Sequence, residues 1–121
     1  MGVFPYRVEI AVRPDGPFES LQALVDTGSL YTGAPRTLLE RLGLTPTAKR
    51  AFQVAGGRII DRDIAEVVIR IDGQTAHTIC VFADEGHQVR LGAVTLEQFA
   101  LAADPVNKRL VPMTAIPADN E

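Results

Sequence analysis

The Asp-Thr-Gly-Ser segment at residues 26–29 carries the strongest chemical signal in the sequence. Asp26 directly follows an apolar stretch, and a glycine turn begins soon after it at Gly28. A carboxylate beside apolar residues needs several hydrogen-bond donors or else gives up its charge, and both outcomes are more typical of working sites than of scaffold. The sequence holds a single Asp-Thr-Gly triplet. If Asp26 performs acid–base chemistry with a second carboxylate, that carboxylate therefore comes from another copy of the chain.

The elements that must position Asp26 are strands. Polar and apolar residues alternate over residues 6–12, a turn rich in Pro and Gly follows at 13–17, and residues 18–25 are the predicted return strand of a hairpin. Asp26 then lies where a strand gives way to a loop. Loops held by a rigid scaffold often carry catalytic groups.

The rest of the chain is predicted to be mostly β with two short helices. Helical spacing of leucines predicts a helix over 35–42 that ends at Gly43, and residues 95–101 predict a second helix. Strands are predicted at 50–54, 58–60, 64–71 and 75–82, with a last strand after the turn that begins at Asp104.

Length and composition exclude several classes of protein. The 121 residues are 46% hydrophobic and 22% charged, which predicts one globular domain over residues 1–121. The net charge of −3 and the scattered basic residues argue against a nucleic-acid partner. No apolar run approaches the ~20 residues that cross a bilayer, so we expect no membrane partner. The single cysteine, Cys80, forms no internal disulfide, which suits a cytoplasmic location.

Four segments follow one another in the order found in a known family. They are the strand ending at Asp26, a glycine-bearing hairpin at 54–60, an apolar-Gly-helix unit at 91–97 and the tail at 101–112. An Asp-Thr-Gly triplet also occurs by chance in unrelated chains, so by itself it is weak evidence for a family. The order and spacing of all four segments are the stronger evidence. With these features the chain resembles the retroviral-type (retropepsin-like) aspartic proteases over residues 8–112, most of all their cellular and prokaryotic members.

The resemblance implies a small closed β-barrel of the acid-protease type, working as a homodimer on a polypeptide substrate. One Asp26 from each chain meets the other at the two-fold axis. Two carboxylates this close cannot both ionise, so one keeps a proton, and the aspartic-protease dyad is the standard example of this coupling. The ionised carboxyl then activates a water that attacks the peptide bond. No metal or other cofactor is implied.

The neighbours of Asp26 are expected to support it. Gly28 lets the backbone come close enough for amide donors to reach the carboxylates. By resemblance, Thr27 points away from the substrate and hydrogen-bonds across the dimer axis to the other chain. Ser29 completes the expected active-site support.

The hairpin tip at Ala55, Gly56 and Gly57 resembles the flap that closes over substrate in this family. Paired glycines give such a tip the freedom to open, and its backbone amides can hold substrate. An ordinary β-turn uses the same residue types. The distance of the tip from Asp26 along the sequence favours the flap.

The sequence departs from the family pattern at Arg90, directly before the apolar-Gly-helix unit. By resemblance, Leu91 lines the substrate pocket and Gly92 lets strand and helix pack closely. Arg90 stands where relatives usually carry an aliphatic pocket residue. If Arg90 faces the cleft, it favours an acidic substrate side chain or pairs with Asp84 or Glu85; if it faces solvent, it has no such role.

A second departure concerns the dimer. Viral relatives carry an Asp and an Arg that form an ion pair at the positions of Leu30 and Ala93. Both partners are missing together, which avoids an unpaired buried charge and predicts a dimer braced by other contacts. Residues 1–5 and 109–115 are candidates for the interleaved sheet of chain ends, restricted to sheet edges by their prolines.

Two other functions remain open from the sequence. The first is a catalytically silent dimerisation or peptide-binding module with the same fold, which Arg90 favours. The second is a phosphate-binding turn of a sugar-kinase-like ATPase, which the chain length opposes. A metal site is not expected, because His77 and Cys80 point to opposite faces of one predicted strand. His87 is read as a solvated loop residue.

Overall fold

The computed structural model describes residues 3–114, which form nine strands, two α-helices and one 3-10 turn. In chain order the elements are β1 (Phe4–Ala11), β2 (Glu19–Val25), β3 (Thr32–Pro35), α1 (Arg36–Arg41), β4 (Ala48–Gln53), the 3-10 turn (Ala55–Gly57), β5 (Ile59–Ile71), β6 (Gln74–Ala83), β7 (Arg90–Leu91), α2 (Ala93–Gln98), β8 (Leu101–Asp104) and β9 (Arg109–Pro112). Among these residues no helix is long and apolar enough to span a membrane.

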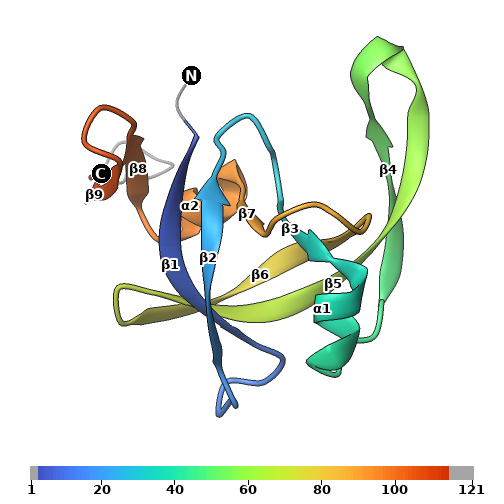
Figure 1. Cartoon of the computed structure of the whole chain (residues 1–121), viewed down its shortest axis with the longest axis horizontal. Coiled ribbons are helices and arrows are strands. Elements are labelled where there is room, and N and C mark those ends of the chain that lie inside the picture. The colour runs from blue at the N-terminus through green and yellow to red at the C-terminus, as the bar shows by residue number, and fades with distance from the viewer. Residues whose placement is uncertain (1–2, 115–121) are drawn as a thin grey trace, which may run out of the picture.

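Six strands close into a barrel (Figure 1). They pair in the order β1-β2-β7-β3-β6-β5, and β5 returns to β1 through an antiparallel pairing of residues 68–70 with residues 9–11. β4 stays outside this ring and pairs with β5 alone. The prediction of a closed, mostly β barrel with two short helices is confirmed.

The barrel interior is filled by side chains from alternate strand positions. Val67, Ile69 and Ile71 of β5 lie in the core, together with Phe82 of β6 and Phe4 of β1. Each of these side chains is at most 2% exposed. Because β-strand residues alternate between faces, the branched side chains of β5 give a continuous apolar inner surface.

Cys80 and His77 lie on opposite sides of β6, as predicted. The Cys80 side chain is buried, and burial raises the pKa of its thiol to about 12. It therefore stays protonated and packs as an apolar group. His77 is exposed, with its Nδ1 atom 3.2 Å from a carboxylate oxygen of Glu66.

β5 is one continuous strand, whereas the sequence predicted two strands separated at residues 61–63. The charged residues there hid the strand, because they interrupt the alternation of polar and apolar positions. In the structure they pair with β4, and Asp63 receives hydrogen bonds from Lys49 and Arg36. These hydrogen bonds hold the pKa of the Asp63 carboxyl below its usual range, and the bond from Lys49 has the largest effect.

The helix predicted at 95–101 is shifted toward the N-terminus. Its first two backbone amides donate to the carbonyl oxygens of Ser29 and Leu30, at 2.8 and 2.9 Å, so α2 begins against the loop that follows Asp26. The chain leaves the helix at Ala100, whose φ is +53°, and Leu101 already begins β8.

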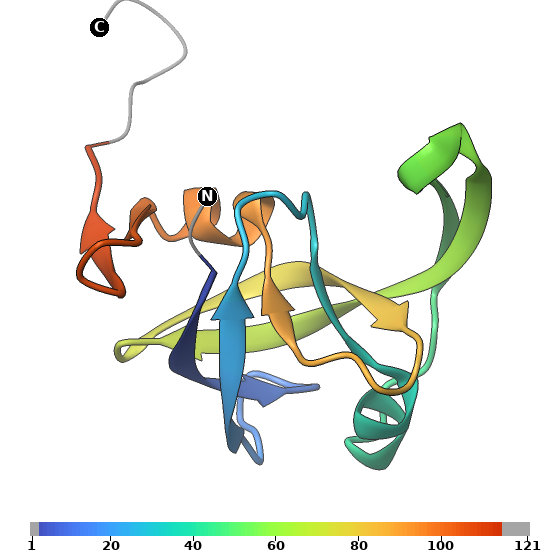
Figure 2. The same ribbon diagram turned by 45° about the horizontal axis from the view of Figure 1, so that its top comes forward.

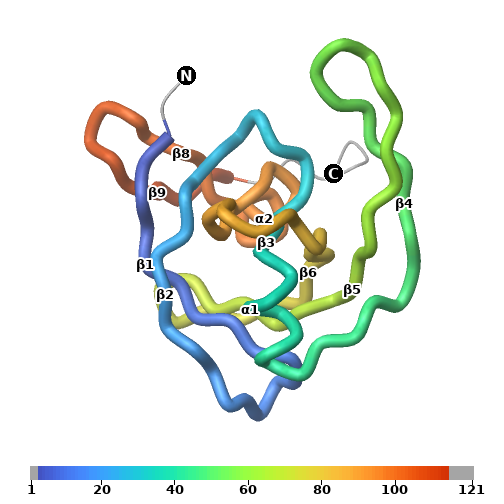
Figure 3. Tube along the Cα trace, turned by 45° about the vertical axis from the view of Figure 1, so that its right-hand side comes forward, coloured from blue at the N-terminus to red at the C-terminus, as the bar shows by residue number. Residues whose placement is uncertain are grey.

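The C-terminal part of the described chain forms a hairpin of its own. β8 and β9 pair antiparallel beside α2, on the side of the barrel away from the β4–β5 hairpin (Figures 1 and 3). Residues 109–112 therefore pair within the chain, and Pro5 pairs with Leu24 of β2. Residues 1, 2 and 115 of the predicted interleaving segments lie outside the described residues.

Candidate active site

Asp26 lies directly after β2, and its backbone and side chain are both held. Its N–H donates to the carbonyl oxygen of Leu91 at 3.0 Å. Its Oδ1 accepts the N–H of Gly28 at 3.0 Å, and its Oδ2 accepts the hydroxyl of Ser29 at 3.1 Å. The side chain is only 16% exposed. The donors that the sequence led us to expect around this carboxylate are thus supplied by the turn that follows it.

Arg90 supplies a third donor. Its Nη1 lies 2.8 Å from the Asp26 Oδ2 atom, in a salt bridge. The pairing of strands explains the contact, because β7 lies between β2 and β3 and sets Arg90 beside Leu24 and Gly33 (Figure 2). Arg90 therefore faces the site, although its side chain is still partly exposed.

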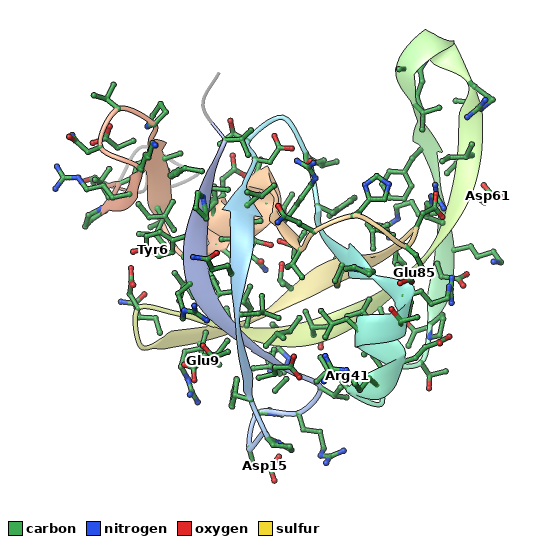
Figure 4. The ribbon with its side chains drawn as sticks, viewed as in Figure 1. Tyr6, Glu9, Asp15, Arg41, Asp61 and Glu85 are labelled. Atoms are coloured by element: carbon green, nitrogen blue, oxygen red, sulfur yellow. The ribbon has the colours of Figure 1, made fainter. Side chains whose placement is uncertain are left out.

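The carboxylates expected to pair with Arg90 are engaged elsewhere. Asp84 accepts two hydrogen bonds from Arg62, at 2.8 and 2.9 Å, which hold the pKa of its carboxyl below its usual range. Glu85 lies near the start of α1 and accepts the hydroxyl and N–H of Thr37 (Figure 4). The expectation that Arg90 pairs with Asp84 or Glu85 is wrong, because Arg62 and Thr37 bind those carboxylates and Arg90 donates to Asp26.

The prediction that Leu91 lines the substrate pocket is also wrong. Its side chain is fully buried in the barrel core. Successive residues of a strand face opposite ways, so once Arg90 faces the site, Leu91 faces the interior. Its contribution to the site is the backbone carbonyl that accepts the N–H of Asp26.

Gly92 allows the start of α2 to pack directly against the loop that follows Asp26. A Cβ atom at this position would lie 2.4 Å from the carbonyl carbon of Tyr31, far inside van der Waals contact. The N–H of Gly92 donates to the hydroxyl of Thr32 at 3.1 Å. No side chain other than hydrogen fits where α2 begins against the Asp26 loop.

A chain of buried threonine hydroxyls lies beneath Gly92. Thr95 Oγ1 is 2.6 Å from the hydroxyl of Thr32 and 2.7 Å from that of Thr78. These residues come from α2, β3 and β6 and are at most 2% exposed. The sequence alone does not reveal this contact, because threonine is common in strands and the spacing of the three threonines does not show that they meet in the fold.

A pocket of about 320 Å³ opens beside Asp26. Ser29 and Arg90, which both bind the Asp26 carboxylate, form part of its wall. Most of the remaining wall is apolar and comes from the β4–β5 hairpin and its neighbours, including Leu30, Phe52, Val54, Ile60 and Val81. His87, expected to be a solvated loop residue, is exposed and also borders the pocket.

The tip of the β4–β5 hairpin projects beyond the barrel (Figures 1 and 3). Its 3-10 turn contains Ala55, Gly56 and Gly57, and both glycines have positive φ, at 87° and 81°. The Val54 N–H donates to the carbonyl of Arg58 at 2.8 Å and closes the turn. The positive φ values explain why glycines occupy the tip.

Thr27 points to a different surface from the pocket. It is exposed and borders a second hollow, of about 250 Å³, between the Asp26 loop, α2 and β8. Ala93 and Met113 are also in the wall of this hollow. The surface next to Asp26 therefore has an apolar depression on the side opposite the β4–β5 hairpin.

Comparison with known proteins agrees with this geometry. The family model described as "Aspartyl protease" matches residues 10–95, which include Asp26, Arg90 and Gly92. No curated protein matches the chain.

Similar solved structures include two retroviral proteases. The simian foamy virus (mac) protease, solved in solution, is 17% identical with a TM-score of 0.57, covering 78% of this chain and 93% of that one. The EIAV protease complexed with the inhibitor HBY-793 is 21% identical with a TM-score of 0.58, covering 78% of this chain and 86% of that one. These likenesses show a retroviral-protease fold. The match of the family model over more than half of the sequence shows that the chain belongs to the aspartyl protease family.

Proposed function

We propose that this protein is an aspartic endopeptidase that works as a homodimer, with one Asp26 from each chain at the centre of the site. The observation that carries the proposal is the Asp26 carboxylate, held by Gly28 and Ser29 at the edge of a largely apolar pocket. A carboxylate fixed in this way beside a cavity is placed for chemistry on a bound ligand.

In the proposed mechanism, the two Asp26 carboxyls share one proton. The ionised carboxyl removes a proton from a water lying between the two chains. That water attacks the carbonyl carbon of the peptide bond while the protonated carboxyl donates its proton to the carbonyl oxygen. The carboxyl that took the water proton then passes it to the amide nitrogen as the C–N bond breaks. The other carboxyl takes a proton from a hydroxyl of the tetrahedral intermediate, so that the dyad again holds one proton.

The pocket and the hairpin above it suit an extended polypeptide substrate. Phe52, Val54 and Ile60 of the hairpin line the pocket, so a substrate side chain in the pocket lies under the hairpin. The tip residues 55–57 then act as the flap, with backbone amides holding the substrate main chain and the pocket selecting its side chain.

The hollow beside Thr27 suits the dimer contact. Thr27 reaches across the two-fold axis, and the apolar wall around Ala93 and Met113 takes apolar side chains of the second chain. This brace replaces the viral ion pair, whose two positions here hold Leu30, which is exposed, and Ala93.

A second function, a catalytically silent peptide-binding or dimerisation module, is favoured by one observation. The salt bridge from Arg90 occupies one of the two Asp26 oxygens through which the carboxylate would bind a catalytic water or a second carboxyl. If this salt bridge stays closed in the dimer, the site binds peptides without cleaving them.

Cleavage of a diverse peptide library from mildly acidic to neutral pH separates the two functions. Wild type is compared with Asp26→Asn and with wild type plus a transition-state inhibitor of aspartic proteases, and ultracentrifugation establishes the dimer. We expect cleavage that disappears in the variant and with the inhibitor. A folded dimer that cleaves nothing at any pH supports the silent module.

A further inference from the structure

Arg90 binds the Asp26 carboxylate and also borders the pocket. Its side chain is 38% exposed, and its contact with Asp26 uses one nitrogen, Nη1. An arginine has five N–H donors in a planar fork. Among residues 3–114, Asp26 accepts the one hydrogen bond that Arg90 makes through its side chain. Most donors of Arg90 are therefore available to a ligand in the pocket.

The other charges around the pocket are already matched. Arg62 and Asp84 border the same pocket, but they bind each other through two hydrogen bonds. Arg90 is thus the guanidinium in the pocket wall whose donors are mostly unused. The apolar surroundings make an unpartnered charge there unfavourable, so Arg90 keeps a carboxylate partner whenever one is within reach.

Arg90 holds one of the two Asp26 carboxylate oxygens that the proposed reaction relies on. A carboxylate has about four lone-pair sites. On Oδ2, both the Ser29 hydroxyl and Arg90 donate, so a water or a second carboxyl can reach that oxygen only after Arg90 moves away. A neutral substrate would force the guanidinium to lose its ionic partner without a replacement. A substrate carboxylate in the pocket would exchange one arginine–carboxylate pair for another, at little net cost.

We propose that Arg90 is a specificity-determining residue that makes this site select an acidic side chain, glutamate or aspartate, next to the scissile bond. The substrate carboxylate takes the guanidinium from Asp26 and thereby frees Asp26 for the dyad. The apolar pocket wall packs against the methylene groups of the glutamate stem, and the planar fork of Arg90 binds its carboxylate through two hydrogen bonds. The inference rests on the proposed endopeptidase function and names its substrate class.

The test uses three peptides that are identical except for Glu, Gln or Leu beside the scissile bond, taken from a sequence that the library shows to be cleaved. The kcat/KM of each is measured for wild type, Arg90→Leu and Arg50→Leu. Arg50→Leu is the matched control, because Arg50 donates to the hydroxyl of Tyr31, which lines the pocket, while Arg50 itself does not border the pocket. The two variants therefore remove the same charge from neighbouring places.

We expect wild type to prefer the Glu peptide over the Gln peptide by about tenfold or more, the effect typical of a charge-assisted hydrogen bond. Arg50→Leu keeps this ratio. Arg90→Leu abolishes it and cleaves the Leu peptide best. A wild-type ratio near one, or a ratio that survives in Arg90→Leu, would overturn the inference. Thermal melting checks the fold of each variant, and Arg90→Gln replaces Arg90→Leu if the latter unfolds.

Binding separates failure of this inference from failure of the proposed function. The same three peptides are made with a reduced, uncleavable scissile bond, and their affinities are measured by fluorescence anisotropy. A Glu preference in binding that is lost in Arg90→Leu, without cleavage by any form, supports acidic recognition and refutes the peptidase. Cleavage that depends on Asp26 but shows no Glu preference supports the peptidase and refutes the role of Arg90.

Discussion

Two arginine–carboxylate pairs border the same pocket, and they are built differently. Arg62 binds Asp84 through two hydrogen bonds, and the side chains of Arg62 and Asp84 are 31% and 63% exposed. Arg90 reaches Asp26 through one hydrogen bond, and Asp26 is only 16% exposed. The first pair satisfies both partners and faces water, so it is structural and weak. The second pair leaves most donors of Arg90 unused and covers Asp26, the carboxylate that we propose to be catalytic.

Removing the Asp26 carboxylate tests most directly whether the two pairs have different roles. Asp26→Asn keeps the shape of the side chain but cannot serve as a general base. We expect kcat/KM for peptide cleavage to fall by about a thousandfold or more, the loss typical of removing an essential catalytic group. Asp84→Asn, the same change in the first pair, is the control and should retain cleavage. Equal losses in both variants would show that the two pairs do not differ in role.

The Arg90 pair also depends on the close packing that places β7 beside Asp26. In Gly92→Ala the added Cβ meets the backbone of Tyr31 at 2.4 Å, where no flexible side chain can give way. We expect a loss of about 3 kcal/mol in the free energy of unfolding, measured by urea denaturation. Gly33→Ala is the matched control, because its Cβ meets the Val81 carbonyl oxygen at an ordinary 3.5 Å. Similar losses in both variants would contradict the special role of Gly92.

These two regions also show what the sequence can predict. The Asp26 segment, the first hairpin and the glycine tip are local, because turn residues and alternating strands specify them over a few positions. They lie where the sequence analysis placed them. The mostly β class follows from the number of alternating strands, although the break at residues 61–63 hid the continuity of β5. The closure of the barrel was implied by the family resemblance.

The contacts that the sequence could not predict all depend on strand pairing at long range. Arg90 meets Asp26 across 64 residues, through the parallel pairing of β2 with β7 and its register. Residues 32–35 form β3 with little alternation of their own, because β6 and β7 offer them paired edges. A one-residue change in register would turn Arg90 into the core and Leu91 toward the pocket, so residue type alone does not decide which one faces Asp26.

The pH dependence of substrate selectivity tests whether Arg90 acts through an ionic interaction with the substrate. Arg90 can attract a glutamate side chain of the substrate only while that side chain is ionised, and its ordinary pKa is about 4.3. The ratio of kcat/KM between the Glu and Gln peptides should therefore be largest near neutral pH and fall toward one below about pH 4. Measuring the ratio cancels the pH dependence of the dyad itself, which acts on both peptides. A ratio that is constant across this range contradicts an ionic role for Arg90.

The smallest effect is expected in the Arg62–Asp84 pair, through the pH dependence of stability. Hydrogen bonds from Arg62, and then the positive charge of Arg62, hold the pKa of the Asp84 carboxyl below its usual range. The Asp84 carboxylate therefore binds a proton less readily in the folded state than in the unfolded chain. The stability from the pair is present above the ordinary pKa of aspartate, about 3.9, and is lost as the pH falls through the lowered value.

Asp84→Asn should therefore flatten the acid limb of the curve of stability against pH and change little at neutral pH, because the pair is exposed and screened by water. Urea denaturation at several pH values between neutral and acid measures this slope. Asp63→Asn serves as the comparison, since two cations lower the pKa of that carboxyl and its removal should flatten the acid limb more. A strong loss of stability at neutral pH in Asp84→Asn would show that the Arg62–Asp84 pair supports the pocket, and the contrast with the exchangeable Arg90 pair would then be one of degree.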